Sequence, residues 1–113
     1  MAQLRVRELG PLVQALAQAG RPLALLDVRE PWELALARIE LPGVPTHTIR
    51  MSEIPRRLTE IDPAQSIVCI CHHGTRSQQV VAFLQRQGFD AVYNLVGGTD
   101  AWSLEVDPSV PRY

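Results

Sequence analysis

The stretch that decides the fold is Ser66-Ile-Val-Cys-Ile-Cys71, which runs directly into His72-His-Gly-Thr-Arg-Ser77. The first six residues form an apolar run that is typical of a strand buried on both faces, as in a parallel sheet. After the loop, apolar residues recur at helical spacing and predict a helix over 77–87 that is closed by Gly88. A buried strand followed by an amphipathic helix is the repeating unit of an α/β fold.

The same alternation of strands and helices continues on both sides of this unit. Apolar residues at helical spacing over 9–16 predict a helix that ends at Gly20. A continuous apolar run over 22–28 predicts a second buried strand. Pro31 suits the first turn of a short helix that reaches residue 37. Further expected elements are a strand over 47–49, a helix over 52–58 capped by Ser52, a strand over 92–96 and a helix over 99–104. Such alternation predicts a parallel sheet with helices on both faces.

Length and composition narrow the classes of protein to consider. The 113 residues are 46% hydrophobic and 20% charged with a net charge of −1, which predicts one domain over 1–113 and no nucleic-acid partner bound through a broad basic surface. No apolar run approaches the roughly 18 residues of a membrane span, and the first seven residues lack an apolar signal core, so we expect a cytoplasmic protein without a membrane partner. All eleven basic residues are Arg, which excludes lysine Schiff bases and Walker-type loops.

The loop after the strand at 66–71 favours a reactive thiol at Cys71. Amides ahead of a helix can form a nest of N–H donors, and the helix N-terminus adds about half a positive charge, so both favour a thiolate. Gly74 permits a positive φ in a tight turn, and Arg76 offers a permanent charge to an anionic substrate. Cys69, inside the apolar run, fits the alternative of a small buried residue. We expect both cysteines to be reduced thiols, because residues i and i+2 of a strand suit no disulfide.

Three stretches together carry a resemblance to a known family. They are Leu25-Leu-Asp-Val-Arg-Glu-Pro-Trp-Glu33, Cys71-His-His-Gly-Thr-Arg-Ser77 and Gly88-Phe-Asp-Ala-Val-Tyr-Asn-Leu-Val-Gly-Gly-Thr-Asp-Ala-Trp102. In this order the chain resembles a single-domain rhodanese, a sulfurtransferase that forms a cysteine persulfide. The resemblance implies a rhodanese-like α/β fold, in which helices flank both faces of a five-stranded parallel sheet.

The resemblance also implies a mechanism without a cofactor. The Cys71 thiolate would take the outer sulfur of thiosulfate or a persulfide donor, and the resulting persulfide would pass that sulfur to a thiophilic acceptor. The implied partners are a small anionic sulfur donor and a thiol or protein acceptor. The candidate residues are Cys71 as the catalytic residue, His72, His73, Gly74, Thr75 and Arg76 for substrate binding, and Asp27, Arg29 and Ser77 in support.

Two other functions remain alternatives. A docking or regulatory module could use the same fold without turnover, although such modules typically lose the cysteine. Phosphatases and arsenate reductases of related fold place five residues between Cys and Arg, whereas four separate Cys71 from Arg76. The shorter loop therefore favours sulfur transfer.

Other residues each have a second interpretation. Asp27 and Arg29 could order the site or simply form an ion pair, and Trp32 could cover a pocket mouth or pack in the core. Adjacent histidines at 72 and 73 suggest a metal, but Cys-x-Cys-His-His is too crowded for the usual separated ligand pairs, so we expect none.

The segment 37–44 lacks the Gly-His-Ile-Pro-Gly-Ala-like stretch of many rhodaneses. The tail over 106–113 resembles those of rhodanese domains fused to sulfur-carrier-activating enzymes.

Overall fold

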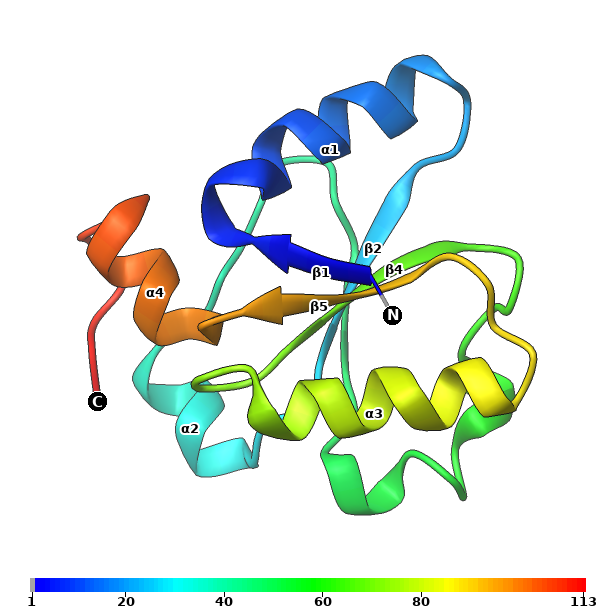
Figure 1. The fold of residues 1–113 in the computed structure, drawn as a ribbon. Coiled ribbons are helices and arrows are strands. Elements are labelled where there is room, and N and C mark those ends of the chain that lie inside the picture. Colours follow the sequence, from blue (N-terminus) through cyan, green and yellow to red (C-terminus); the bar gives the residue numbers. More distant parts are fainter. Residues whose placement is uncertain (1) are drawn as a thin grey trace.

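The computed structural model describes residues 2–113 and shows an α/β fold (Figure 1). Its five strands are β1 (Ala2–Arg5), β2 (Leu23–Asp27), β3 (Thr46–Thr48), β4 (Ser66–Ile70) and β5 (Val92–Val96). They form one sheet in the order β1-β5-β4-β2-β3, and every neighbouring pair is parallel. The predicted five-stranded parallel sheet is confirmed.

Helices cover both faces of this sheet. They are α1 (Val6–Gln18), α2 (Pro31–Leu36), α3 (Thr75–Arg86) and α4 (Gly98–Glu105), with short 3-10 turns η1 (Met51–Glu53) and η2 (Leu58–Glu60). Figure 1 shows α1 on one face of the sheet and α3 on the other, and α4 packs beside α1. Within residues 2–113 we find no helix whose length and apolar character would let it span a bilayer.

The core consists of two apolar clusters, one on each face. Successive strand side chains point to opposite faces, so Leu25 joins the cluster under α1 while Leu26 joins the cluster under α3. Both β2 and β4 are buried at every position. This two-sided burial explains why their sequences are continuous apolar runs without alternation.

The structure lacks one predicted helix and contains one strand that the sequence pattern does not predict. The helix expected over 52–58 is absent, and Ser52 caps no helix: the segment forms η1, a turn and η2. Pro55 in its middle has no N–H to donate, and i→i−3 hydrogen bonds to Arg50 and Met51 take the place of a regular helix. The sequence pattern does not predict β1, because β1 is a four-residue edge strand with Leu4 as its buried hydrophobic residue. The other elements lie within a few residues of their predicted bounds.

The register of the sheet places two loops at one edge. Asp27, the last residue of β2, pairs with Ile70, the last residue of β4, and the Val28 amide donates to the Ile70 carbonyl at 3.0 Å. The chain therefore leaves both strands side by side, at the carboxyl edge where ligands of open α/β sheets bind.

Candidate active site

Cys71 lies at the bottom of the loop that joins β4 to α3. Its side chain is buried, with the residue only 1% exposed, and its Sγ accepts hydrogen bonds from the Gly74 N–H at 3.0 Å and the Ser77 N–H at 3.4 Å. Gly74 precedes the first turn of α3 with a φ of +96°, as the sequence predicted. Two backbone donors and the helix N-terminus thus converge on one sulfur, an arrangement suited to a negative charge.

The loop rests against the start of α4 (Figure 1). The Thr99 amide donates to the Cys71 carbonyl at 3.0 Å, and the Asp100 amide donates to the His72 carbonyl at 3.1 Å. A Cβ on Gly98 would lie only 2.2 Å from the Cys71 carbonyl oxygen. The Gly97-Gly98 pair therefore allows α4 to approach the loop closely enough to hold its carbonyls.

A chain of buried polar side chains continues from the sulfur toward the edge of the sheet. The Ser77 Oγ lies 3.3 Å from the Cys71 Sγ and donates to the Asn94 Oδ1 at 2.5 Å, and the Asn94 Nδ2 donates to the Gln3 Oε1 at 3.0 Å. Ser77 and Asn94 are buried, whereas Gln3 is exposed. The chain links the loop to β5 and β1.

Arg76 forms a bidentate ion pair with Glu33 of α2, at 2.6 and 2.8 Å. The Arg76 hydrogen bonds lower the pKa of the buried Glu33 carboxyl to about 2, and the same pairing raises the pKa of Arg76. The cation predicted to receive an anionic substrate already has a carboxylate partner. Its position at the loop end is as expected, but the pair also fastens α2 to the loop.

Tyr113 covers this network from outside. Its hydroxyl donates to the Glu33 Oε2 at 2.7 Å and accepts from the Arg29 Nη1 at 3.1 Å. Its ring stacks on His72 with centroids 3.8 Å apart and meets the edge of Trp32 at 6.1 Å. Burial raises the pKa of the Tyr113 hydroxyl.

Comparison with known proteins places this loop in a family. The sequence profile of the Rhodanese-like domain matches residues 11–105. The chain belongs to the rhodanese family. It is 40% identical over 91 residues to the putative sulfurtransferase YtwF of Bacillus subtilis, covering 80% of this chain and 84% of that protein.

Other similar proteins include larger enzymes and a solved structure. The chain is 32% identical over 105 residues to adenylyltransferase and sulfurtransferase MOCS3-1 of Zea mays, covering 87% of this chain and 22% of that protein. It spans between 21% and 30% of the length of the first three curated relatives it matches. The crystal structure of a rhodanese-like domain protein from Staphylococcus aureus superposes with a TM-score of 0.75 at 27% identity, covering 100% of this chain and 99% of the other.

Asp27 and Arg29 of this rhodanese form a buried ion pair at 2.8 Å, the alternative weighed from the sequence. Burial opposes the Arg29 charge, but the Asp27 hydrogen bond and charge outweigh it and raise the Arg29 pKa. Arg29 also donates to the Ala37 carbonyl at 2.6 Å. The pair therefore orders the segment after β2, and it reaches the Cys71 loop through Tyr113 and Glu33.

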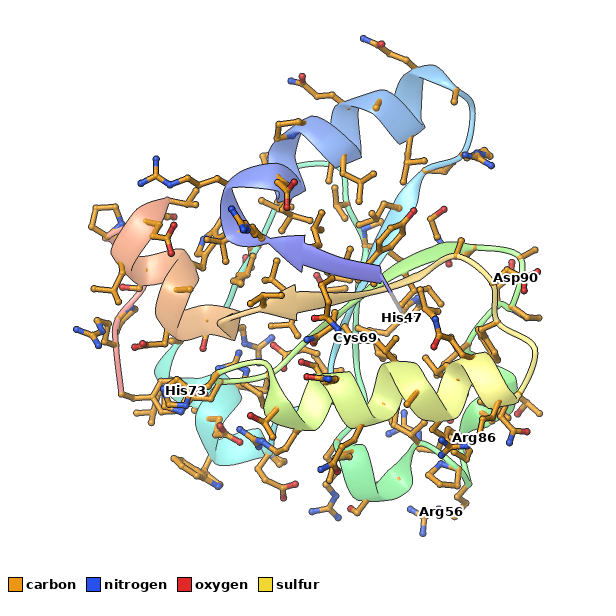
Figure 2. The ribbon with its side chains drawn as sticks, in the orientation of Figure 1. His47, Arg56, Cys69, His73, Arg86 and Asp90 are labelled. Atoms are coloured by element: carbon orange, nitrogen blue, oxygen red, sulfur yellow. The ribbon has the colours of Figure 1, made fainter. Side chains whose placement is uncertain are left out.

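The two loop histidines differ in surroundings. His72 is half-buried between Tyr113 and His73, burial lowers its pKa, and its Nε2 has no hydrogen-bond partner among residues 2–113. His73 is exposed at the loop surface, 3.9 Å from an Asp100 carboxylate oxygen (Figure 2). Possible metal-ligand atoms of these three residues all lie within 4.8 Å of one another. However, Asp100 already forms an ion pair with Arg112 at 2.8 Å, and this guanidinium competes with a metal ion for the carboxylate.

The remaining candidates have these positions. Cys69 is buried between the sheet and α3 (Figure 2), and burial raises its pKa to about 12, so it stays a neutral thiol. Thr75 is exposed in the first turn of α3. Trp32 is 63% exposed, which contradicts the core interpretation.

The sequence analysis assigns no role to three residues of the network around Cys71: Glu33, Asn94 and Tyr113. Of these, only Asn94 gave a signal, as a polar residue inside an apolar strand.

Proposed function

We propose that this chain is a sulfurtransferase that carries a sulfane sulfur as a persulfide on Cys71. The observation that carries the proposal is the position of the Cys71 Sγ, which accepts backbone N–H groups from Gly74 and Ser77 at the start of a twelve-residue helix. Relatives named as sulfurtransferases support the same class of reaction.

The proposed reaction has two displacement steps at sulfur. The Cys71 thiolate attacks the outer sulfur of thiosulfate and forms a new S–S bond, while the old S–S bond breaks and sulfite leaves with its electron pair. An acceptor thiolate then attacks the terminal sulfur of the persulfide, which releases the Cys71 thiolate. Charge balances in both steps, and each leaves one negative charge in the loop, where the N–H donors stabilise it.

The roles proposed for the other residues follow from their contacts. Gly74 and Ser77 hold the charge on the sulfur, and Arg76 closes the loop while paired with Glu33. His72, His73 and Thr75 line the outer side of the loop, where a donor or acceptor would arrive. Asp27 and Arg29 support this surface through Tyr113.

The proposal also covers the sulfur donor, the sulfur acceptor and the cellular compartment. The donor is thiosulfate or a small persulfide, and the acceptor is a thiol or a protein such as a sulfur carrier. A relative named a putative sulfur carrier protein, YrkF of Bacillus subtilis, together with the tail over 106–113, supports a carrier as acceptor. We place the reaction in the cytoplasm, where free thiols such as Cys69 and Cys71 stay reduced, and treat 1–113 as one working domain.

Steady-state turnover tests the proposal. The purified protein is assayed with thiosulfate or glutathione persulfide as donor and cyanide as acceptor, beside Cys71→Ser and, as the matched control, Cys69→Ser. We expect ping-pong kinetics that Cys71→Ser abolishes and Cys69→Ser preserves. Cys71-dependent hydrolysis of a phosphomonoester, without thiocyanate formation, would instead favour the phosphatase alternative.

A further inference from the structure

We propose that Asn94 is a positioning residue for Cys71, because its side-chain amide determines in which direction the Ser77 hydroxyl proton points. The inference rests on the proposed function and adds to it a residue that does not touch the reacting sulfur. It concerns the hydrogen bonds that Cys71 finds in its two forms, as a thiol and as an anion.

The Ser77 hydroxyl lies between two groups that compete for its single proton. The Cys71 Sγ is 3.3 Å from the Ser77 Oγ, and the Asn94 Oδ1 is 2.5 Å from it. Since an amide oxygen only accepts, Ser77 donates to Asn94 in this arrangement and presents a lone pair to the sulfur. That lone pair can accept a hydrogen bond from an S–H group, whereas it is repelled by the negative charge of a thiolate.

Asn94 is itself held by Gln3. Asn94 on β5 pairs in register with Gln3 on β1, and the Asn94 Nδ2 donates to the Gln3 Oε1 at 3.0 Å. This bond directs Oδ1 toward Ser77. Asn94 is only 2% exposed, so solvent contributes little to its orientation, whereas Gln3 is exposed and its amide can turn.

A second arrangement of the same three side chains preserves every hydrogen bond. If both amides rotate by half a turn, Gln3 donates to the Asn94 oxygen, Asn94 donates to the Ser77 Oγ, and the Ser77 hydroxyl donates to the sulfur. Cys71 as a thiolate then has three donors instead of two. An amide at position 94 serves both arrangements, whereas a carboxylate could accept from Ser77 but could donate neither to Ser77 nor to Gln3.

Other groups also act on Cys71 and must be separated from this effect. The charge of Arg76, at the start of α3, interacts with Cys71, although Glu33 of α2 pairs with that charge. Cys69 of β4 interacts with Cys71 too, but it stays neutral until high pH. His72 adjoins it in the loop. None of these groups bonds to the Ser77 hydroxyl, so a Ser77→Ala background isolates the contribution of Asn94.

The test is the pH titration of the Cys71 thiolate by its ultraviolet absorbance, taken as the difference between each variant and the same variant with Cys71→Ser. Asn94→Asp fixes an acceptor beside Ser77, so we expect its titration midpoint to rise by about one pH unit, a tenfold effect in the fraction of thiolate. Asn94→Leu removes the competing acceptor, so the midpoint should not rise. In the Ser77→Ala background, Asn94→Leu should leave the midpoint unchanged.

Because substitutions of the buried Asn94 and Ser77 can prevent folding, a substitution of the exposed Gln3 provides a second test. The carboxylate of Gln3→Glu can only accept hydrogen bonds, so it holds the Asn94 Nδ2 toward position 3 and the Asn94 Oδ1 toward Ser77. The titration midpoint of Cys71 should therefore rise, and it should rise less in the Ser77→Ala background. Equal shifts of Gln3→Glu in both backgrounds, or an Asn94→Leu shift that survives Ser77→Ala, would overturn the inference. Since the titration needs no sulfur donor, it is independent of whether Cys71 accepts sulfur.

Discussion

Arg76 and Glu33 form a bidentate ion pair between residues that are 43 positions apart in the sequence. The Glu33 side chain is 3% exposed and that of Arg76 is 33% exposed. The pair joins the first turn of α3 to α2, and it therefore sets how the loop that begins at Cys71 is closed.

Glu33→Gln should weaken this closure. The substitution leaves the guanidinium of Arg76 without its counter-charge, and we expect a loss of about 2 kcal/mol in the free energy of unfolding, as for a hydrogen-bonded charge pair. Urea denaturation measures it. Glu30→Gln, whose nearest cation is 3.6 Å away and exposed, is the matched control and should cost less than about 1 kcal/mol.

The same pair predicts a pH dependence of stability. Because the pKa of Glu33 falls from its ordinary value of 4.5 to about 2 on folding, the folded state gains stability that is fully present above about pH 4.5. That stability is lost as pH falls from there toward 2, up to about 3 kcal/mol. Denaturation at a series of pH values should show this loss in the wild type and a smaller loss in Glu33→Gln. Parallel curves for the two proteins would contradict the assignment.

Tyr113 should stabilise the outer side of the loop through two separable contacts. Tyr113→Phe keeps the ring on His72 but removes the hydroxyl between Arg29 and Glu33, at a cost of about 1 kcal/mol. Tyr113→Ala also removes the ring, so it should cost more and speed hydrogen exchange of the amides over 72–76. Tyr93→Phe is the control, since Tyr93 is a half-buried tyrosine whose side chain packs against the apolar cluster under α1. Equal exchange in Tyr113→Ala and the wild type would show that the ring does not order the loop.

Gly98→Ala should displace α4 from the loop. The added Cβ would meet the Cys71 carbonyl oxygen at 2.2 Å, on a backbone with a φ of +57°. Gly20→Ala separates the two causes of strain, because Gly20 has a φ of +71° but no other atom within 4 Å of the added Cβ. We expect Gly20→Ala to cost about 1 to 2 kcal/mol and to retain sulfurtransferase turnover. Gly98→Ala should cost more and should lose most of that turnover.

The sequence predicted where Cys71 lies, in the loop just ahead of α3, because local rules determine that position. A buried apolar strand, a glycine with positive φ and an amphipathic helix place Cys71 at a helix N-terminus in any parallel sheet. The fifth strand, β1, was expected only from the family resemblance, because its own four residues form too weak a pattern to predict a strand.

The contacts around the site could not be predicted, because they depend on how distant segments meet. Glu33 reaches Arg76 only because α2 lies beside the loop, and Tyr113 reaches both Arg29 and His72 only because the tail folds back. Asn94 is an intermediate case. An amide inside an apolar strand is typical of a residue with a buried polar partner, but the contact of Asn94 with Ser77 depends on how α3 packs on β5.

Whether Cys71 carries the transferred sulfur is measured most directly by the intact mass of the reduced, folded protein after incubation with thiosulfate or glutathione persulfide. The predicted result is a gain of one sulfur atom in the wild type and in Cys69→Ser, none in Cys71→Ser, and complete discharge by cyanide as thiocyanate. An unchanged mass with both donors would contradict the persulfide mechanism and would favour a docking module that keeps the fold without the chemistry.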